Sequence, residues 1–173
     1  KYMDFLIENK WYGNKSKKGF YEKTKEKDEK GRPVILALNL ETLEYAPTQR
    51  VNIPSLKDAK GIEELPKRIQ YIFKAEDKAG ELFRRSLAGL FAYVSNRIPE
   101  ISDNLYAIDD ALRAGFAWEM GPFQYWDTVG LQAGIDIAEK HGESVADWVK
   151  EMIAAGHDSF YKVENGVKQY YDK

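Results

Sequence analysis

The sequence predicts a mainly α-helical protein that carries short β-hairpins. From residue 55 onward, apolar residues recur at the three- and four-residue spacing of amphipathic helices. Before residue 55, short aromatic and aliphatic segments alternate with charged or glycine-containing turns, a pattern typical of strands. Near the end of the chain, Asn165-Gly166 separates two short runs that contain valine and tyrosine, which indicates a tight hairpin turn.

The composition is that of a folded domain and excludes several classes of function. The 173 residues are 43% hydrophobic and 31% charged, enough to bury a core. No apolar run approaches the roughly 18 to 20 residues of a membrane-spanning helix, so no membrane span is expected. The absence of cysteine excludes disulfides, thiolate nucleophiles and cysteine metal sites, and it suits a cytoplasmic protein. A net charge of −2 gives no general attraction to nucleic acid.

The first 54 residues are expected to hold a helix end followed by loops and strands. The first residue is Lys1, and the amphipathic residues after it predict a chain that starts inside a larger protein. The expected order is a helix end, a glycine-bounded polar loop, an aromatic strand, a charged solvated loop and two strands, at residues 2–8, 11–19, 20–23, 24–32, 33–38 and 42–46.

The remaining chain is expected to be helical up to the last hairpin. Ser55 and either Ser102 or Asp103 are expected to cap helices, and Gly121-Pro122 is expected to start one. Arg84 is expected on the solvent side of its helix. The expected helices cover residues 55–61, 62–73, 77–94, 103–115, 122–130, 132–140 and 144–155, before a hairpin at residues 160–171.

Two segments of the chain repeat one another. Residues 5–23 and residues 151–163 each read as a helix end, a polar loop and a strand that begins with Phe-Tyr. Self-similarity on this scale predicts a duplicated unit whose first copy lacks its beginning.

The titratable residues have structural explanations. His141 lies at an expected helix end, where a cation is favoured, and His157 lies in a loop. Neither has a carboxylate at a ligand spacing, so no metal site is expected. Asp109 and Asp110 are neighbours on a helix and point about 100 degrees apart, so they do not form a carboxylate dyad.

Two further candidate binding features are also better explained by structure. The lysine-rich loop 13–19 follows a helix and enters a strand, the reverse of the order found in phosphate-binding loops. The aromatic residues Trp118, Phe123, Tyr125 and Trp126 surround an expected helix start, where they are expected to form core rather than a base-stacking platform.

Two motifs resemble a known family. The first runs Ile108-Asp109-Asp110-Ala111, then Gly115-Phe116-Ala117-Trp118-Glu119-Met120-Gly121-Pro122-Phe123, then Asp127-Thr128-Val129-Gly130. It resembles the signature of the C-terminal domain of 3-hydroxyacyl-CoA dehydrogenases. The second, Gly13-Asn14-Lys15-Ser16-Lys17-Lys18-Gly19-Phe20-Tyr21, resembles the motif that closes the same domain.

The resemblance implies a fold and a domain organisation. The fold would be the helical domain of the 6-phosphogluconate dehydrogenase C-terminal type, with short β-hairpins at the ends of each repeat. Residues 1–54 would be the tail of a first such domain, residues 55–75 linker helices and residues 76–173 a second domain. The chain looks most like multidomain fatty-acid oxidation proteins, which add an enoyl-CoA hydratase domain and a nucleotide-binding domain.

The resemblance also implies a function for the parent protein. It would oxidise 3-hydroxyacyl-CoA to 3-ketoacyl-CoA with NAD in fatty-acid β-oxidation. The family binds NAD on a Gly-x-Gly-x-x-Gly domain that also carries a His-Glu pair, and this chain has neither, so the isolated chain is expected to be inactive. The partners would be the acyl-CoA substrate, the missing nucleotide-binding and hydratase domains, and a second copy in a homodimer.

No catalytic, cofactor-binding or metal-binding residue is therefore assigned. The family's catalytic Asn has no counterpart, because the position 24 residues before Ile108 is Arg84, and Asn96 lies only 12 before it. The residues singled out are expected to be structural: Gly13, Lys15, Gly19, Phe20, Tyr21, Gly115, Gly121, Pro122, Phe123, Asp127 and Gly130. Two alternatives stay open. One is a free-standing acyl-CoA-binding module that uses Trp118, Trp126 and residues 15–18, and the other is a dimerisation domain.

Overall fold

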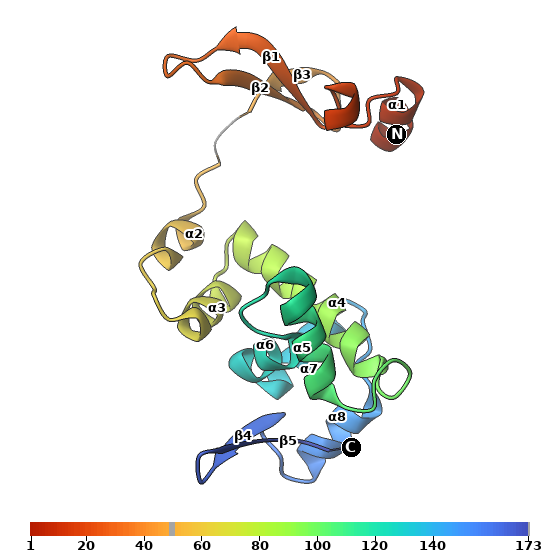
Figure 1. Ribbon diagram of the computed structural model, residues 1–173, viewed down its shortest axis with the longest axis vertical. Helices are drawn as coiled ribbons and strands as arrows, with labels where there is room; N and C mark the ends of the chain where they lie inside the picture. The colour runs from red at the N-terminus through yellow and green to blue at the C-terminus, as the bar shows by residue number, and fades with distance from the viewer. Residues whose placement is uncertain (49–50, 173) are drawn as a thin grey trace. The chain divides into compact units, whose positions relative to one another are not determined.

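The chain folds into two compact units. The computed structural model describes residues 1–48 and 51–172 (Figure 1). The first unit runs from Lys1 to Val51 and the second from Asn52 to Lys173. The residues expected to form linker helices lie in the second unit. None of the described helices combines the length and the apolar content required to cross a bilayer.

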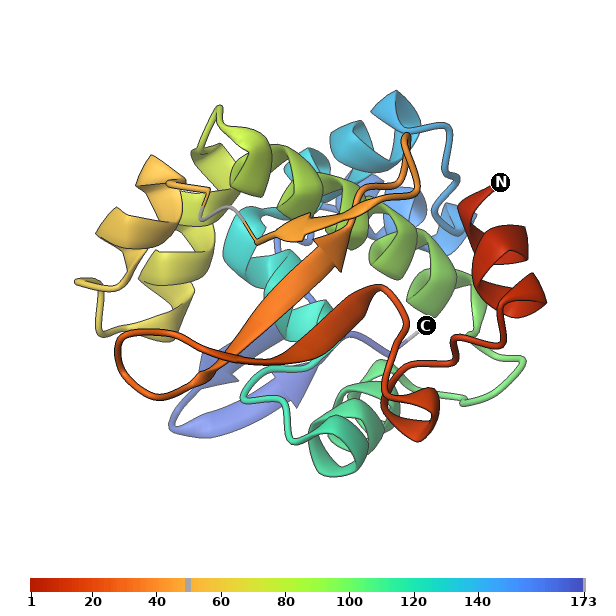
Figure 2. The same ribbon diagram turned by 90° about the horizontal axis from the view of Figure 1, so that it is seen from above.

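The first unit is a small antiparallel sheet preceded by a helix. Its elements are α1 (Tyr2–Glu8), the 3-10 helix η1 (Asn14–Ser16), β1 (Tyr21–Lys27), β2 (Pro33–Leu38) and β3 (Tyr45–Pro47). The strand order is β1-β2-β3, and the β1–β2 ribbon is the longest feature of the unit (Figure 2).

The strands of this unit differ from the sequence prediction in two places. β1 continues to Lys27, through residues predicted to be a solvated loop, because an exposed two-stranded ribbon can carry charge on both faces. Only the tip is a turn, where the Asp28 carboxylate accepts the amides of Lys30 and Arg32 at 2.9 Å each. The strand predicted at residues 42–46 is shorter and begins later, at Tyr45. The chain before it forms a turn, in which the Asn39 side chain accepts the amides of Glu41 and Thr42.

The second unit is a helical body closed by a hairpin. The helices are α2 (Pro54–Ala59), α3 (Leu65–Lys74), α4 (Lys78–Asn96), α5 (Leu105–Phe116), α6 (Pro122–Val129), α7 (Leu131–Lys140) and α8 (Asp147–Ala154). β4 (Tyr161–Glu164) pairs antiparallel with β5 (Val167–Tyr170). Asn165 and Gly166 form the turn with φ of 52° and 77°, as a two-residue hairpin loop requires. The predicted mainly helical fold is confirmed.

The core of the second unit is an aromatic stack covered by aliphatic residues. The rings of Phe91 on α4 and Trp126 on α6 lie 4.5 Å apart and nearly parallel, and both are fully buried. Phe160, just before β4, packs edge-on against Trp126 at 5.2 Å. The hairpin is thereby joined to the helical core by a large buried side chain, a contribution of about 3 kcal/mol or more.

Two predicted helix caps are wrong. α2 begins at Pro54, and the hydroxyl of Ser55 donates to Asp77 at 2.8 Å instead of capping its own helix. Asp77 in turn caps α4 by accepting two amides of its first turn. The cap of α5 is Asn104, whose side chain accepts the amide of Ala107 at 3.1 Å.

The prediction that Arg84 lies on the solvent side of α4 is also wrong. Its guanidinium donates to the carbonyls of Phe73 and Ala75 at 2.5 and 2.7 Å. These carbonyls end α3 and have no partner within that helix, so Arg84 satisfies them from the next helix. Leu82, in contrast, is exposed on the outer face of α4.

Candidate functional site

Asp109 on α5 caps the start of α6 from another helix. Its carboxylate is only 2% exposed and accepts the amides of Phe123 at 2.8 Å and Gln124 at 3.2 Å. Gly121, the N-cap residue of α6, has no side chain to do this. A Cβ on Gly121 would lie 2.3 Å from the Asp109 Cγ, so glycine makes room for the carboxylate. Pro122 at the first helical position lacks an amide that would need a partner.

Asp127 holds the terminal hairpin to the helical body. Its carboxylate accepts the amides of Phe160 at 2.7 Å and Tyr161 at 3.0 Å. The structure places this residue, which the sequence predicts to be structural, against the first residues of the hairpin. Three residues after Asp127, Gly130 ends α6 with a φ of 98°, which favours glycine.

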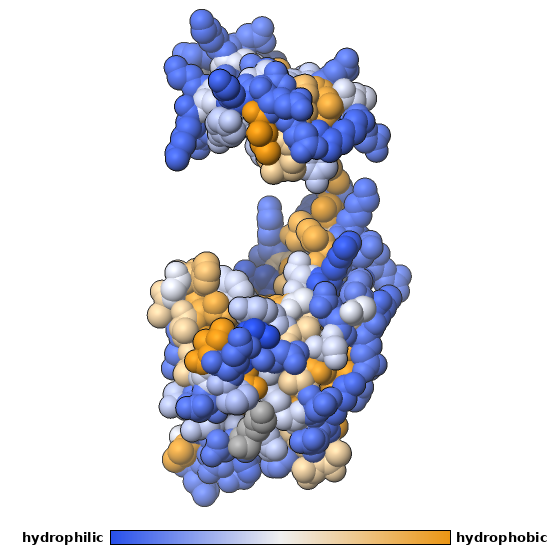
Figure 3. All heavy atoms as spheres, turned by 90° about the vertical axis from the view of Figure 1, so that its right-hand side faces the viewer, coloured by the Kyte–Doolittle hydropathy of each residue, from blue (hydrophilic) through white to orange (hydrophobic). Residues whose placement is uncertain are grey.

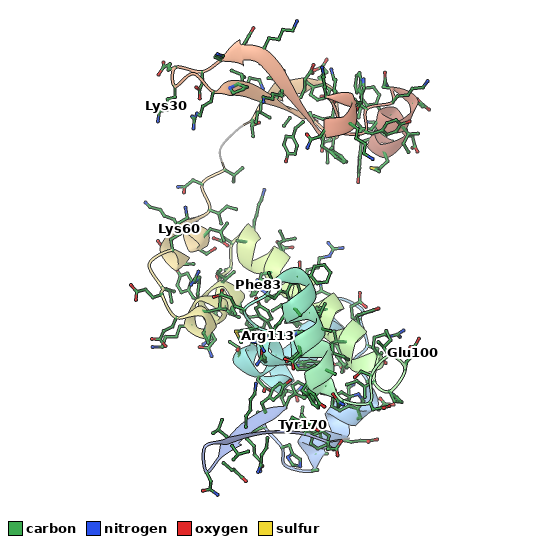
Figure 4. All side chains as sticks on the ribbon, in the orientation of Figure 1. Lys30, Lys60, Phe83, Glu100, Arg113 and Tyr170 are labelled. Atoms are coloured by element: carbon green, nitrogen blue, oxygen red, sulfur yellow. The ribbon has the colours of Figure 1, made fainter. Side chains whose placement is uncertain are left out.

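Tyr161 joins the two carboxylates. Its amide donates to the Asp127 carboxylate on α6, and its hydroxyl donates to Oδ2 of Asp109 on α5 at 2.9 Å. The Lys168 ammonium lies 4.2 Å from the centre of the Tyr161 ring. Asp109, Tyr161 and Lys168 line a polar surface pocket of about 300 Å³. Tyr170, labelled in Figure 4, lines the same pocket. The cluster connects α5, α6, β4 and β5 at one place.

The ionisation of this cluster follows from its burial. Burial raises the pKa of Asp109, against the hydrogen bonds from Phe123 and Tyr161 that lower it. Burial likewise raises the pKa of Asp127 to about 6, although two amides favour its charged form. Burial and the nearby Asp109 carboxylate raise the pKa of Tyr161, so its hydroxyl stays a donor at neutral pH.

The raised pKa of Asp127 predicts a pH-dependent stability. The folded protein binds a proton at Asp127 more tightly than the unfolded chain does, so the free energy of unfolding should fall as pH rises from about 4 to about 6. With allowance for partial exposure, this contribution is about 1 to 2 kcal/mol. Urea unfolding across this range should therefore show a pH slope that is smaller in Asp127→Asn, which does not titrate.

The same variant should be less stable overall at pH 7, where the Asp127 carboxylate is ionised. The Asn amide nitrogen would face a backbone N–H that now has no acceptor, which costs about 1 to 3 kcal/mol. An unchanged pH slope in Asp127→Asn would contradict the assignment of the titration to this carboxylate.

Outside this cluster, the two histidines and Asn96 were the other candidates for chemistry among the described residues. His141 lies at the end of α7, and His157 packs edge-on against Tyr171. The Asn96 amide donates to the carbonyls of Ala92 and Ser144 at 2.8 Å each. Within residues 1–48 and 51–172, no three His, Asp or Glu side chains are grouped as a metal site requires.

Gly13 and Gly19 bring the two ends of loop 13–19 close together. A Cβ on Gly19 would lie 2.8 Å from the backbone of Gly13, which itself has a φ of 86°. Lys15 is exposed, whereas Lys18 lies 4.2 Å from the ring centres of both Trp11 and Tyr45. Lys18, which the sequence suggested only as part of an acyl-CoA-binding loop at residues 15–18, is therefore the lysine of this loop with a packing role.

The other predicted residues divide between core and surface. Phe123 is fully buried and lies 4.9 Å from Phe160, ring centre to ring centre. Trp118 is exposed, next to Phe116 and Tyr125. Gly115 lies in α5 with open space around its Cα, so no steric contact requires glycine there.

Asp109 and Tyr161 are the residues that sequence reasoning missed. One signal was available for Asp109, because it lies four residues after Leu105 on the apolar face of its helix. A second signal was the start of α6. Its N-cap residue is glycine, which has no side chain to accept the first free amides of the helix, so a carboxylate from another element is favoured there.

Comparisons with known proteins identify the family. Residues 72–169 match the family model described as "3-hydroxyacyl-CoA dehydrogenase, C-terminal domain". A "Probable 3-hydroxyacyl-CoA dehydrogenase" of Bacillus subtilis is 33% identical over 99% of this chain and 21% of its own length. A "Putative fatty acid oxidation complex trifunctional enzyme" of Rickettsia felis is 29% identical over 70% of this chain and 15% of its own length. No solved structure matches the chain.

The chain thus spans about a fifth of the Bacillus relative and less of the Rickettsia protein. The family match covers the region that holds Asp109, the Gly121-Pro122 helix start and Asp127. The chain belongs to the 3-hydroxyacyl-CoA dehydrogenase C-terminal domain family.

Proposed function

We propose that this chain is a structural part of a cytoplasmic, NAD-dependent enzyme that oxidises 3-hydroxyacyl-CoA to 3-ketoacyl-CoA in fatty-acid β-oxidation. Within that parent enzyme, its role is to pack against the catalytic domains and to close one side of the acyl-CoA cleft. The names and lengths of the relatives support this proposal.

The observation that carries the structural role is the hydrogen bonding of the two buried carboxylates. Asp109 accepts three bonds and Asp127 accepts two, all from groups of this chain. Tyr161, which could act as an acid, donates to Asp109. Burial raises the pKa of all three groups, and each is engaged in holding the hairpin or capping α6.

The described residues do not fit NAD. A dinucleotide phosphate binds at a helix N-terminus that follows a glycine-rich turn. The N-terminus of α6 already binds the Asp109 carboxylate, and the glycine loop 13–19 leads into β1 rather than into a helix. We therefore assign NAD binding to another domain of the parent enzyme.

A free-standing acyl-CoA module is less well supported. Trp126 is fully buried in the core and has no surface to offer a ligand. The Lys18 ammonium forms an ion pair with Glu22 at 2.7 Å and lies over two aromatic rings, so it is already engaged within its own unit. Of the residues proposed for such a module, Trp118, Lys15 and Lys17 are exposed, but one tryptophan and two lysines do not make a CoA site.

The proposal predicts a division of activity that an absorbance assay can measure. The isolated 173-residue chain, mixed with NAD and a 3-hydroxyacyl-CoA, should form no NADH, whereas the parent enzyme should form it under the same conditions. Calorimetry of the isolated chain with acyl-CoA should show no submicromolar binding. NADH formation by the isolated chain, or an inactive parent enzyme, would contradict the proposal.

A further inference from the structure

Lys168 lies on the inner face of the terminal hairpin. In the register of the two strands, Tyr161 is opposite Tyr170, and Val163 is opposite Lys168. Opposed residues share a face of an antiparallel pair, as do residues two apart on one strand, so Lys168 shares its face with Tyr161 and Tyr170. This face meets α5, because the Tyr161 hydroxyl donates to Asp109. The hairpin therefore carries a charged lysine on the side that packs against the helical body.

The Lys168 ammonium balances the charge of the two buried carboxylates. It lies 4.2 Å from the centre of the Tyr161 ring, and it lines the same pocket as Tyr161 and Asp109. Burial raises the pKa of Asp109 and of Asp127, and the positive charge of Lys168 lowers both. An opposite charge favours the ionised form of a carboxyl group, so Lys168 offsets part of the cost of burying these two groups.

The other charged groups near Tyr161 do not replace this lysine. Burial raises the pKa of Tyr161, and three nearby aspartates raise it further. One of these aspartates, Asp110, pairs with Arg113 at 3.2 Å. Among the described residues, Lys168 is therefore the cation that remains to balance the two buried carboxylates.

Lys168 is also open to a reagent. It is exposed, whereas Asp109 is only 2% exposed. The pocket of about 300 Å³ beside it has further walls from Tyr106, Gln124 and Tyr170, and a cavity of this size can hold a small acyl group. Figure 3 shows hydrophilic side chains over much of the visible surface of the second unit, where the loss of one charge changes stability little. The position of Lys168 beside buried carboxylates makes its charge different in effect.

We propose that Lys168 is an acylation site, at which a short-chain acyl-CoA thioester removes the charge that balances Asp109 and Asp127 and so loosens the terminal hairpin. The unprotonated amine attacks the thioester carbonyl carbon, a C–N bond forms and the C–S bond breaks. CoA leaves as the thiolate and takes up the proton that the nitrogen loses, so the step needs no oxidant or reductant. The inference rests on the proposed function, which places this chain in an enzyme whose substrate and product are acyl-CoA thioesters.

Loss of this charge affects the hairpin through Asp127. The amides of Phe160 and Tyr161 donate to the Asp127 carboxylate and thereby join the hairpin to α6. When the hairpin opens, water reaches this carboxylate and solvates its charge. Without the nearby cation, the closed state keeps the cost of burying the carboxylate and loses the attraction that offsets it, so opening becomes more frequent. A neutral Lys168 also loses its cation–π attraction to the Tyr161 ring.

Lys168→Gln, which imitates the neutral acyl-lysine, tests the effect of the charge. In the 173-residue chain, the Tyr161 amide should exchange with solvent at least about fivefold faster in this variant than in the wild type. The Asp127 carboxyl group, followed by NMR, should titrate at a higher pH. Lys168→Arg keeps the charge and should change neither quantity. Lys162→Gln is the matched control, because Lys162 lies on the opposite face of the hairpin and pairs with the exposed Glu164 at 2.8 Å.

Incubation of the chain with acetyl-CoA tests the acylation itself. The reaction is run at about pH 8, where a larger fraction of each lysine is unprotonated than at neutral pH. Mass spectrometry of the digested protein should find an acetyl group on Lys168, and the acetylated chain should show the faster Tyr161 exchange of Lys168→Gln. Lys168→Arg treated in the same way should keep the slow exchange, because arginine is not acetylated and the other lysines do not balance the buried carboxylates.

Three outcomes would overturn the proposal. They are a Lys168 that stays unmodified, whether or not other lysines react, a Lys168→Gln chain with the exchange and titration of the wild type, and fast exchange in acetyl-CoA-treated Lys168→Arg. The last would show that other lysines control the hairpin. A parent enzyme that lacks dehydrogenase activity would overturn only the proposed function, since none of these measurements requires turnover, so the two failures are distinguishable.

Discussion

Gly134→Ala is expected to lower the free energy of unfolding by about 3 to 4 kcal/mol, because α7 has no room for a methyl group at this position. A Cβ there would lie 2.0 Å from Trp126 Nε1 and 2.5 Å from Cδ1. The ring cannot move aside, since it is fully buried, stacked on Phe91 and bonded to the carbonyl of Leu131 at 3.0 Å. Urea unfolding monitored by tryptophan fluorescence would measure the loss.

Gly89→Ala is the matched control for this substitution. Gly89 lies inside α4, and a Cβ there would meet nothing within 4 Å. The variant should gain about 0.5 to 1 kcal/mol, because alanine is the better helix former and no contact opposes it. Similar losses in the two variants would show that helix propensity, and not the contact with Trp126, determines the effect.

Gly121→Ala is expected to cost about 3 kcal/mol and to loosen the terminal hairpin. The added Cβ would lie 2.3 to 2.5 Å from the side chain and Cα of Asp109. Displacing that carboxylate removes the cap of α6 and the acceptor of the Tyr161 hydroxyl. Unfolding free energies and faster amide exchange at Phe123 would measure these two effects.

Gly115→Ala, in the same motif, provides the comparison for Gly121→Ala. Gly115 has open space around it, so its substitution should be neutral or slightly stabilising. If Gly121→Ala left both stability and hairpin exchange unchanged, the contact with Asp109 would have no energetic importance.

The helices could be predicted from sequence because their signals are local. Apolar spacing located α4 to within two residues, and Gly121-Pro122 located the start of α6. The Asn165-Gly166 turn likewise needs only its two residues and the strands on either side. Such features depend on neighbours in sequence, which a single chain displays directly.

The polar contacts of the site could not be predicted in the same way. Asp109 binds groups 14, 15 and 52 residues later, and its place on the apolar face of α5 does not identify these partners. Ser55 has the composition of a cap, yet it binds Asp77, 22 residues away. Long-range partners of this kind are determined by packing, so a buried carboxylate becomes evident only when the helices are in place.

The central claim is that the Asp109, Asp127 and Tyr161 cluster stabilises the fold and performs no chemistry. Tyr161→Phe in the parent enzyme tests it most directly, since the variant removes one hydroxyl and leaves the ring in place. We expect kcat and KM within about twofold of the wild type, together with a loss of about 1 kcal/mol in unfolding free energy. A fall in kcat of more than about a hundredfold at unchanged stability would contradict the claim and make Tyr161 a catalytic acid.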